Sequence, residues 1–269
     1  FGTVVASIQE QVTYGIDIPT AWGCVLLYTL QIYYDFSGYS DIAIGLSNIF
    51  GLELDENFRF PYTAVSITDF WRKWHISLGT WFKEYIYIPL GGNRKGWIRT
   101  LVNLGIVFLI TGIWHGAGGN YIFWGALHGT VRILEKCIEK KKLYIKIPKA
   151  VKWIFTMLIV SIGWQAFRFS NIKELFDYYK ILFGIVRFDA SDIFYQFVYF
   201  FDKKAIILCT VGILGATIFS ADRMKRAVNY LQKKSVGLII QEIVLLGVMI
   251  VSVICMVNST YSPFIYFKY

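Results

Sequence analysis

The sequence predicts an all-α, polytopic integral membrane protein, and three observations lead to this fold class. Of the 269 residues, 56% are hydrophobic and only 17% are charged, which is more apolar than an ordinary soluble domain. Several apolar runs approach the ~20 residues that a helix needs to cross a bilayer. Lys and Arg gather between these runs. We therefore expect membrane helices together with a re-entrant helical hairpin and interfacial amphipathic helices.

The apolar runs fall into two groups. The clearest predicted spans are bounded by basic or turn-forming residues and cover 153–169, 205–219 and 236–257. Other runs are shorter or more polar and cover 21–34, 36–52, 101–114 and 121–138. A short, polar crossing has to be shielded by protein, because lipid cannot satisfy exposed polar groups.

The first long helix is predicted to follow Pro19 and to be interrupted at Ser37 and Gly38. It carries Asp35 and Asp41 within apolar surroundings. Ionisable groups at membrane depth usually serve function or pair with a neighbour. The alternative, with equal weight, is an interfacial helix end at which both carboxylates are in water.

The net charge of +9 is distributed as in a membrane protein and does not indicate nucleic-acid binding. Lys and Arg concentrate in 72–99, 132–152 and 223–234, and such loops are usually cytoplasmic. Segment 170–203 has charges of both signs and is predicted to lie outside. The aromatic C-terminal residues 258–269 are expected at the outer interface.

The residues 53–99 mix aromatic side chains with both charges. Ser66 or Thr68 is a suitable cap for a helix over 69–83. Apolar and aromatic residues recur on it at three- and four-residue spacing, namely Trp71, Trp74, His75, Leu78 and Phe82. This pattern predicts an amphipathic helix at the cytoplasmic interface with His75 on its buried face.

Between Arg99 and Arg132 the chain is predicted to enter the membrane and return, since both ends are basic. Each arm has some 14–18 apolar residues, or about 21–27 Å of helix. The turn is the Gly-rich segment 116–120, and His115 directly precedes it. His115 is thus predicted to lie deep in the membrane.

Three histidines are the candidates for chemistry, because no nucleophile elbow or phosphate-binding Gly-rich loop is present. A buried His115 is either bonded to a backbone carbonyl or available as a base near neutral pH. His128 shares a face with Trp124 and is interpreted as structural, packing against the other arm. We expect no metal site, since the histidine spacing does not favour zinc and the cysteines stand far apart.

Three stretches resemble the membrane-bound O-acyltransferase family: "YYDFSGYSDIAIGLSNIFGLELDENFRFPY", "DFWRKWHISLGTWFKEYIYIPLGG" and "GIWHGAGGNYIFWGALHG". The similarity is greatest to the bacterial branch that acetylates alginate or peptidoglycan or transfers D-alanine to teichoic acid. The detailed resemblance covers about residues 28–135. Family members have further N-terminal spans, and the chain lacks an initiating Met and a signal-peptide pattern. We expect residues 1–269 to be a single membrane domain, the C-terminal part of such a fold.

The resemblance matches His115 to the invariant histidine of the family and His75 to its second characteristic polar position. It implies that His115 removes a proton from the acceptor hydroxyl, while His75 orients or stabilises the thioester carbonyl. Alternatively, His75 only ties the interfacial helix to the hairpin. The residues expected to bind substrate are Trp71, Arg72, Trp74, Trp114 and Asn120. Basic residues of this loop are candidates for binding a phosphopantetheine or CoA phosphate, although topology and anionic lipid better explain most of them: Arg72, Lys73, Arg94, Lys95 and Arg99.

The resemblance further implies that an acyl group, most simply acetyl, moves from a thioester donor to a hydroxyl of a cell-surface polysaccharide or peptidoglycan. No bound cofactor is expected, because the donor is acetyl-CoA or an acyl-carrier protein. Expected partners are membrane lipids, an extracytoplasmic transferase and the carrier protein, but no nucleic acid. The expected location is a bacterial inner (plasma) membrane, which the chain crosses several times.

Three alternatives remain from the sequence. D-alanyl transfer to teichoic acid is the alternative within the enzyme class. A transporter or channel subunit would use the buried Asp and His residues as a path, but many transporters show internal repeats, and none is evident here. A non-catalytic membrane scaffold would tolerate loss of both His75 and His115.

Overall fold

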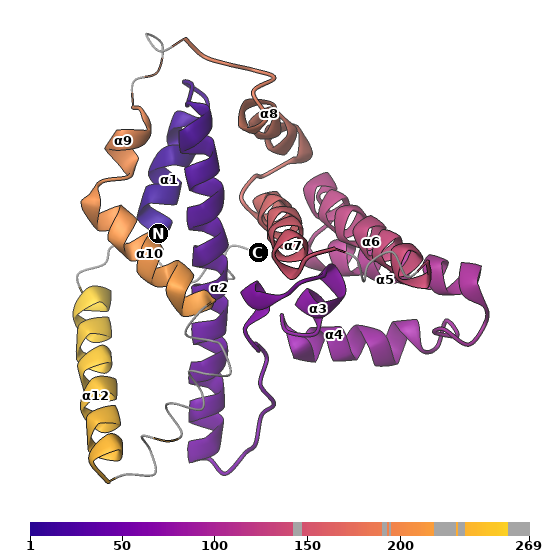
Figure 1. Ribbon diagram of the computed structural model, residues 1–269, viewed down its shortest axis with the longest axis horizontal. Coiled ribbons are helices and arrows are strands. Elements are labelled where there is room, and N and C mark those ends of the chain that lie inside the picture. Colours follow the sequence, from indigo (N-terminus) through magenta and orange to yellow (C-terminus); the bar gives the residue numbers. More distant parts are fainter. Residues whose placement is uncertain (142–146, 190–192, 194, 218–229, 231–234, 258–269) are drawn as a thin grey trace.

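The computed structural model describes residues 1–141, 147–189, 193, 195–217, 230 and 235–257 (Figure 1). These residues form helices joined by turns and loops, and the β-structure among them is an isolated antiparallel bridge between Phe58 and Trp74. The all-α prediction is therefore confirmed for the described part of the chain. The basic segment 223–229 and 231–234 and the tail 258–269 lie outside it.

The long helix α2 (Ile18–Ile49) is the axis of the fold (Figure 1). Asp17 caps its N-terminus by accepting a hydrogen bond from the backbone N–H of Thr20 at 2.8 Å. The interruption predicted at Ser37 and Gly38 is wrong, because α2 continues through both residues. A glycine inside a helix costs only about 1 kcal/mol. Breaking the helix would instead expose backbone polar groups, which is costlier in apolar surroundings.

Tyrosine hydroxyls attach the neighbouring segments to α2. Tyr62 of η1 (Pro61–Thr63) donates to the carbonyl of Thr29 at 2.5 Å. Tyr178 of α8 (Ile172–Leu182) donates to the carbonyl of Ala21 at 2.7 Å. Each tyrosine buries an apolar ring and satisfies its polar end on the helix backbone. The helices α1 (Gly2–Gln11) and α10 (Lys203–Ala216) pack on α2 as well.

Helices α5 (Trp97–His115) and α6 (Gly119–Lys140) form the predicted hairpin, with the Gly-rich turn at its tip. Both arms are longer than expected. The arms approach so closely that a Cβ atom on Gly125 would lie 2.4 Å from the carbonyl oxygen of Phe108. A Cβ on Gly112 would lie 2.5 Å from that of Tyr121. Small residues at the crossing are typical of membrane helix pairs.

Three described helical segments are long and apolar enough to cross a membrane: α5, Lys149–Phe167 and Val236–Val257. The second combines α7 (Lys149–Trp164) with η4 (Gln165–Phe167), and the third lies in α12 (Ser235–Val257). The predicted span 205–219 is represented by α10, which has 14 residues, while 218–219 lie outside the described chain. The chain is thus an all-helical membrane protein, and the re-entrant path of the hairpin remains a prediction.

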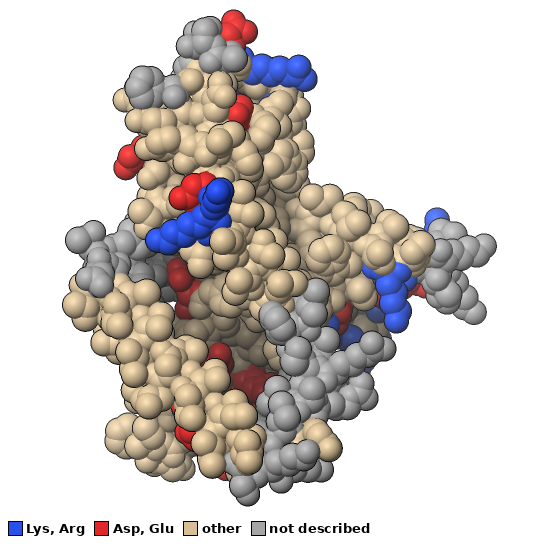
Figure 2. All heavy atoms as spheres, turned by 60° about the vertical axis from the view of Figure 1, so that its left-hand side comes forward, with Lys and Arg blue, Asp and Glu red and all other residues tan. Residues whose placement is uncertain are grey.

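The surface fits a membrane environment. In Figure 2, residues other than Lys, Arg, Asp and Glu cover most of the visible face, and charged side chains appear in isolated groups. Within the described chain, the spanning segment of α12 buries none of its residues. Apolar side chains of this number and length need lipid or further protein to cover them.

Candidate active site

The amphipathic helix predicted over 69–83 is divided, and the division lies at His75. The structure has α3 (Ile67–Trp71), α4 (Ile76–Phe82) and a π-helical turn η2 (Lys83–Tyr87). His75 separates α3 from α4 with a φ of 46°, in the left-handed region that non-glycine residues rarely adopt. Such strained residues persist only where the surroundings hold them, and they cluster at functional sites.

Backbone pairing with an upstream segment explains the break. The N–H of Arg59 donates to the carbonyl of Lys73 at 2.9 Å, and the N–H of Ile76 donates to that of Asn57 at 3.0 Å. These bonds flank the bridge between Phe58 and Trp74. A helix through residue 75 would lose both of them. The long-range pairing therefore overrides the local helical periodicity.

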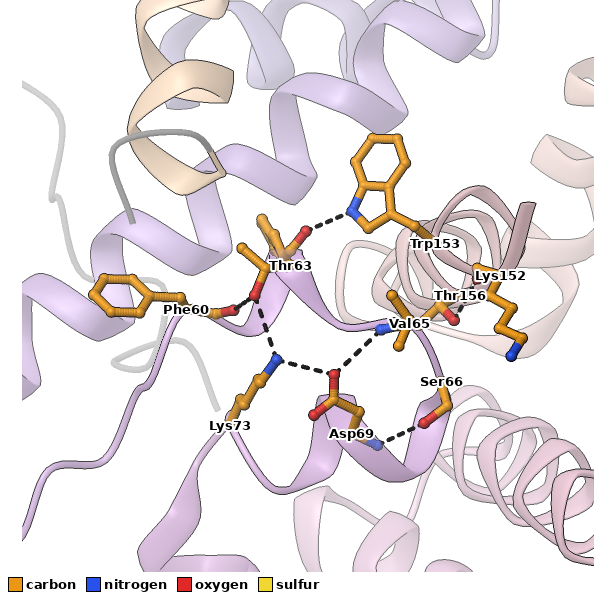
Figure 3. Close-up of polar contacts among 10 residues, drawn as sticks. Phe60, Thr63, Val65, Ser66, Asp69, Lys73, Lys152, Trp153 and Thr156 are labelled. Carbon is orange, nitrogen blue, oxygen red and sulfur yellow. Dashed lines mark hydrogen bonds and ion pairs between the residues drawn. The ribbon is translucent and has the colours of Figure 1, made fainter. Parts of the chain in front are cut away.

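Short-range polar contacts fix α3 (Figure 3). The Ser66 hydroxyl accepts from the N–H of Asp69 at 2.9 Å, which confirms Ser66 as the cap. The Asp69 carboxylate in turn accepts from the Lys73 ammonium at 2.9 Å and from the N–H of Val65 at 3.2 Å. Lys73 is thus occupied in holding its own segment, so it does not serve as a free cation at this site.

Glu135 of α6 attaches α3 to the hairpin, and the sequence did not identify it. Its carboxylate accepts from the N–H of Ile67 at 2.5 Å, from the N–H of Thr68 at 2.9 Å and from the Thr68 hydroxyl at 2.8 Å. Glu135 is buried, and an acidic group at the N-terminus of a helix is favourable. The signal for it was a carboxylate seven residues after His128, which is about two turns further along the same face of the helix.

Replacing Glu135 by alanine is expected to lower the free energy of unfolding by about 1–3 kcal/mol, because buried N–H groups of α3 lose their acceptor. The melting temperature of the purified protein in detergent measures this effect. Glu139→Ala is the matched control, since Glu139 is exposed on the same helix. Equal melting temperatures for both variants would contradict the anchoring role.

His75 is half-buried, and one of its ring nitrogens lies within hydrogen-bond distance of another side chain. Its Nδ1 lies 3.2 Å from Oδ1 of Asn57, and the ring edge packs against Phe36 at a centroid distance of 4.8 Å. Burial lowers the pKa of His75 to about 4, so the ring is neutral at physiological pH. A neutral imidazole can accept a proton, which is the property that a base requires.

His115 ends α5 and is half-buried among aromatic rings. Its ring meets Trp124 edge to face at 5.1 Å and Phe167 at 5.1 Å. It also lies close enough to His75 for the charges of the two rings to interact. The fold thus brings both histidines that the sequence proposed to one aromatic cluster, in which Trp164 packs against Trp74, the neighbour of His75, and against Trp124, which contacts His115.

His128 has a different setting, because it is completely buried. Its Nδ1 accepts a hydrogen bond from the Trp71 indole at 3.4 Å, and its ring stacks on Phe108 of the other arm. The packing predicted for His128 is therefore confirmed. A Cβ on Gly163 would lie 2.8 Å from its Nε2, so α7 covers the remaining face.

A pocket of about 510 Å³ lies between the α3–α4 segment and the hairpin. His75 and Trp71 line it, together with three cationic side chains: Arg72, Lys83 and Arg132. No Asp or Glu is among the described residues that line it. Nη1 of Arg132 is buried without a hydrogen-bond partner in the described chain. This pocket suits a ligand with an anionic group and an apolar part.

The residues predicted to bind substrate occupy different places. Trp71 and Arg72 line the pocket, whereas Trp74 is buried in the aromatic cluster beside it. Trp114 is 54% exposed, and Asn120 donates to the carbonyls of Ala166 and Phe169 at 2.8 and 3.0 Å. His115 is not among the residues that line this pocket. The binding roles of all five residues remain predictions.

Comparison with known proteins identifies relatives. Residues 15–170 match the sequence model of the membrane-bound O-acyltransferase family. A probable alginate O-acetylase of Pseudomonas putida is 37% identical over 269 residues, covering 95% of this chain and 55% of the relative. The peptidoglycan O-acetyltransferase of Helicobacter pylori is 44% identical over 168 residues, covering 62% of this chain and 31% of the relative.

A more distant relative is named for a different activity. The teichoic acid D-alanyltransferase of Bacillus subtilis is 32% identical over 140 residues, covering 49% of this chain and 35% of the relative. This chain spans about half the length of the alginate O-acetylase that it matches. The matched residues 15–170 include His75, His115 and all the described residues that line the pocket.

Proposed function

Because the chain belongs to the membrane-bound O-acyltransferase family, we propose that the protein moves an acyl group from a thioester to a hydroxyl. The observation that carries this proposal is that His115 lies within electrostatic range of His75, which lines a pocket with cationic side chains and, among the described residues, no acidic ones. The alginate O-acetylase and the peptidoglycan O-acetyltransferase among the relatives support acetyl as the group transferred.

The proposed reaction uses His115 as the base. Its imidazole takes the proton of the acceptor hydroxyl, and the oxygen attacks the thioester carbonyl carbon. A C–O bond forms and the C–S bond breaks, and the departing thiolate takes the proton from the imidazolium. His75 orients the reacting groups at the pocket wall. Exclusion of water protects the thioester from hydrolysis, and the aromatic cluster around both histidines supports this.

We place the donor in the cationic pocket. Acetyl-CoA and the phosphopantetheine arm of an acyl-carrier protein both carry phosphate, and guanidinium groups bind phosphate through paired N–H donors. Arg132 offers a buried nitrogen for such a bond. The apolar remainder of the pocket suits the pantetheine chain. The donor is a co-substrate, so no bound cofactor is proposed.

Arg132→Gln is expected to raise the KM for acetyl-CoA about tenfold or more while leaving kcat within a few-fold, because the phosphate contact is equal in the ground and transition states. The measurement is CoA release by the full-length protein across a range of donor concentrations. Arg187→Gln is the control, since Arg187 is exposed and remote from the pocket. An unchanged KM would remove Arg132 from the donor site.

The acceptor in this proposal is a hydroxyl of a cell-surface polysaccharide or peptidoglycan, and the location is a bacterial plasma membrane. A separate extracytoplasmic transferase would complete delivery to the polymer, and an acyl-carrier protein is the alternative donor partner. D-alanyl transfer to teichoic acid is the second candidate, supported by the Bacillus relative. The lower identity and coverage of this relative favour acetylation over D-alanyl transfer.

Radiolabelled acetyl-CoA tests the proposal in membranes that contain the full-length protein. We expect label to appear in the surface polymer and free CoA to accumulate. Supplying a D-alanyl carrier protein instead tests the second candidate. A transporter or a scaffold would release no CoA and transfer no label, so that outcome would reject the acyltransferase assignment.

A further inference from the structure

Asn57 lies beside His75 although it belongs to a loop outside the helices. Its backbone carbonyl accepts from the N–H of Ile76, which holds the residue in place. Its side-chain Oδ1 is 3.1 Å from the backbone nitrogen of Ser77, 3.0 Å from the Ser77 hydroxyl and 3.2 Å from Nδ1 of His75. Three polar groups thus converge on one amide oxygen.

The backbone N–H of Ser77 determines which end of the amide faces this cluster. A backbone N–H can only donate, so the atom of Asn57 that it meets must be the oxygen. That oxygen can only accept. The ring nitrogen Nδ1 of His75, at 3.2 Å from it, must therefore carry a proton, because two lone pairs facing each other at this distance would repel.

We infer that Asn57 is a positioning residue that holds His75 in the Nδ1–H tautomer, which leaves the lone pair on Nε2. None of the hydrogen bonds in the described chain uses Nε2. His75 lines the pocket, and the nitrogen that this tautomer leaves free can accept a hydrogen bond but cannot donate one.

This inference rests on the proposed function and specifies the role of His75 in the proposed reaction. Stabilising the thioester carbonyl would require an N–H donor at Nε2, which this tautomer lacks. Accepting a hydrogen bond from the acceptor hydroxyl requires a lone pair, which it has. His75 therefore orients the hydroxyl, while His115 takes its proton.

A simpler role for Asn57 has to be separated from this one. His75 occupies the cap position of α4 but its side chain does not bond to the backbone N–H groups of that helix, and Asn57 supplies the capping oxygen to Ser77 instead. If capping were the entire role, loss of Asn57 would reduce stability without affecting the tautomer.

Nitrogen NMR of the full-length protein labelled with ¹⁵N-histidine distinguishes the two roles, with the His75 signals assigned from their loss in His75→Gln. In the unmodified protein we expect Nδ1 to be protonated and Nε2 unprotonated at neutral pH. Asn57→Leu is expected to give a mixture of tautomers, because the Ser77 hydroxyl left beside Nδ1 can donate or accept. Asn57→Asp keeps the acceptor and is expected to keep the tautomer.

Turnover with acetyl-CoA is the second measurement. Asn57→Leu is expected to lower kcat at least tenfold, and Asn57→Asp to retain activity within about threefold of the unmodified protein. Ser77→Ala is the matched control and is expected to preserve both tautomer and turnover, since the backbone N–H remains. The NMR result does not depend on catalysis, so an inactive protein with the expected tautomer would reject only the proposed function. An unchanged tautomer in Asn57→Leu would overturn this inference.

Discussion

Replacing His115 by alanine or glutamine is expected to lower acyl transfer by about 10²–10⁴-fold, which is the usual contribution of a general base. The position of the ring at the end of α5 and its proximity to His75 suit it to the role of general base. Transfer of label from acetyl-CoA to the surface polymer, by the full-length protein at matched expression, measures the loss.

The aromatic contacts of His115 require a control for folding. Glutamine retains much of the volume that packs against Trp124 and Phe167, so His115→Gln separates loss of the base from loss of packing. We expect its melting temperature to stay within a few degrees of the unmodified protein while turnover is lost. Unchanged turnover in His115→Gln would exclude the residue as the base.

Gly125→Ala is expected to produce a large loss of stability, about 2 kcal/mol or more. The new Cβ would lie 2.4 Å from a backbone oxygen of α5, and a backbone atom cannot turn away as a side chain can. The hairpin arms would have to separate, and the contacts along the whole crossing would weaken. Thermal unfolding in detergent, followed by helical circular dichroism, measures the change.

The same helix pair provides a matched control. A Cβ on Gly105 of α5 would lie 3.6 Å from a side-chain carbon of Ile133, which is an ordinary contact. Gly105→Ala is therefore expected to be neutral or to stabilise the protein by up to about 1 kcal/mol through helix propensity. If both alanine variants had the same melting temperature, the close approach of the arms would not be the source of hairpin stability.

Local signals were sufficient for much of the fold. The apolar composition, the basic ends of the segment between Arg99 and Arg132, and the Gly-rich turn at 116–120 correctly predicted membrane helices and the hairpin. Ser66 was correctly included among the possible caps, because capping is decided by the first turn alone. The family resemblance was confirmed by the match over residues 15–170.

Contacts between distant segments decided the rest. Periodicity predicted one helix through His75, but backbone pairing with residues 57–59 divides that helix. The sequence around residue 75 contains no signal for this pairing. Asn57, Arg132 and Glu135 were overlooked for a related reason. A polar residue in a charged loop, or near the basic end of a helix, is normally solvated, and only the fold shows which of these side chains turn inward.

The two walls of the pocket differ in how readily they can deform. On one side, α5 and α6 meet backbone to backbone at Gly112 and Gly125, leaving no flexible side chains between them to absorb a shift. On the other side, the chain passes through two left-handed residues, Phe60 and His75, and a π-helical turn. If the pocket takes the proposed donor, we expect the opening that admits it to hinge on residues 57–87, while the helices of the hairpin keep their positions.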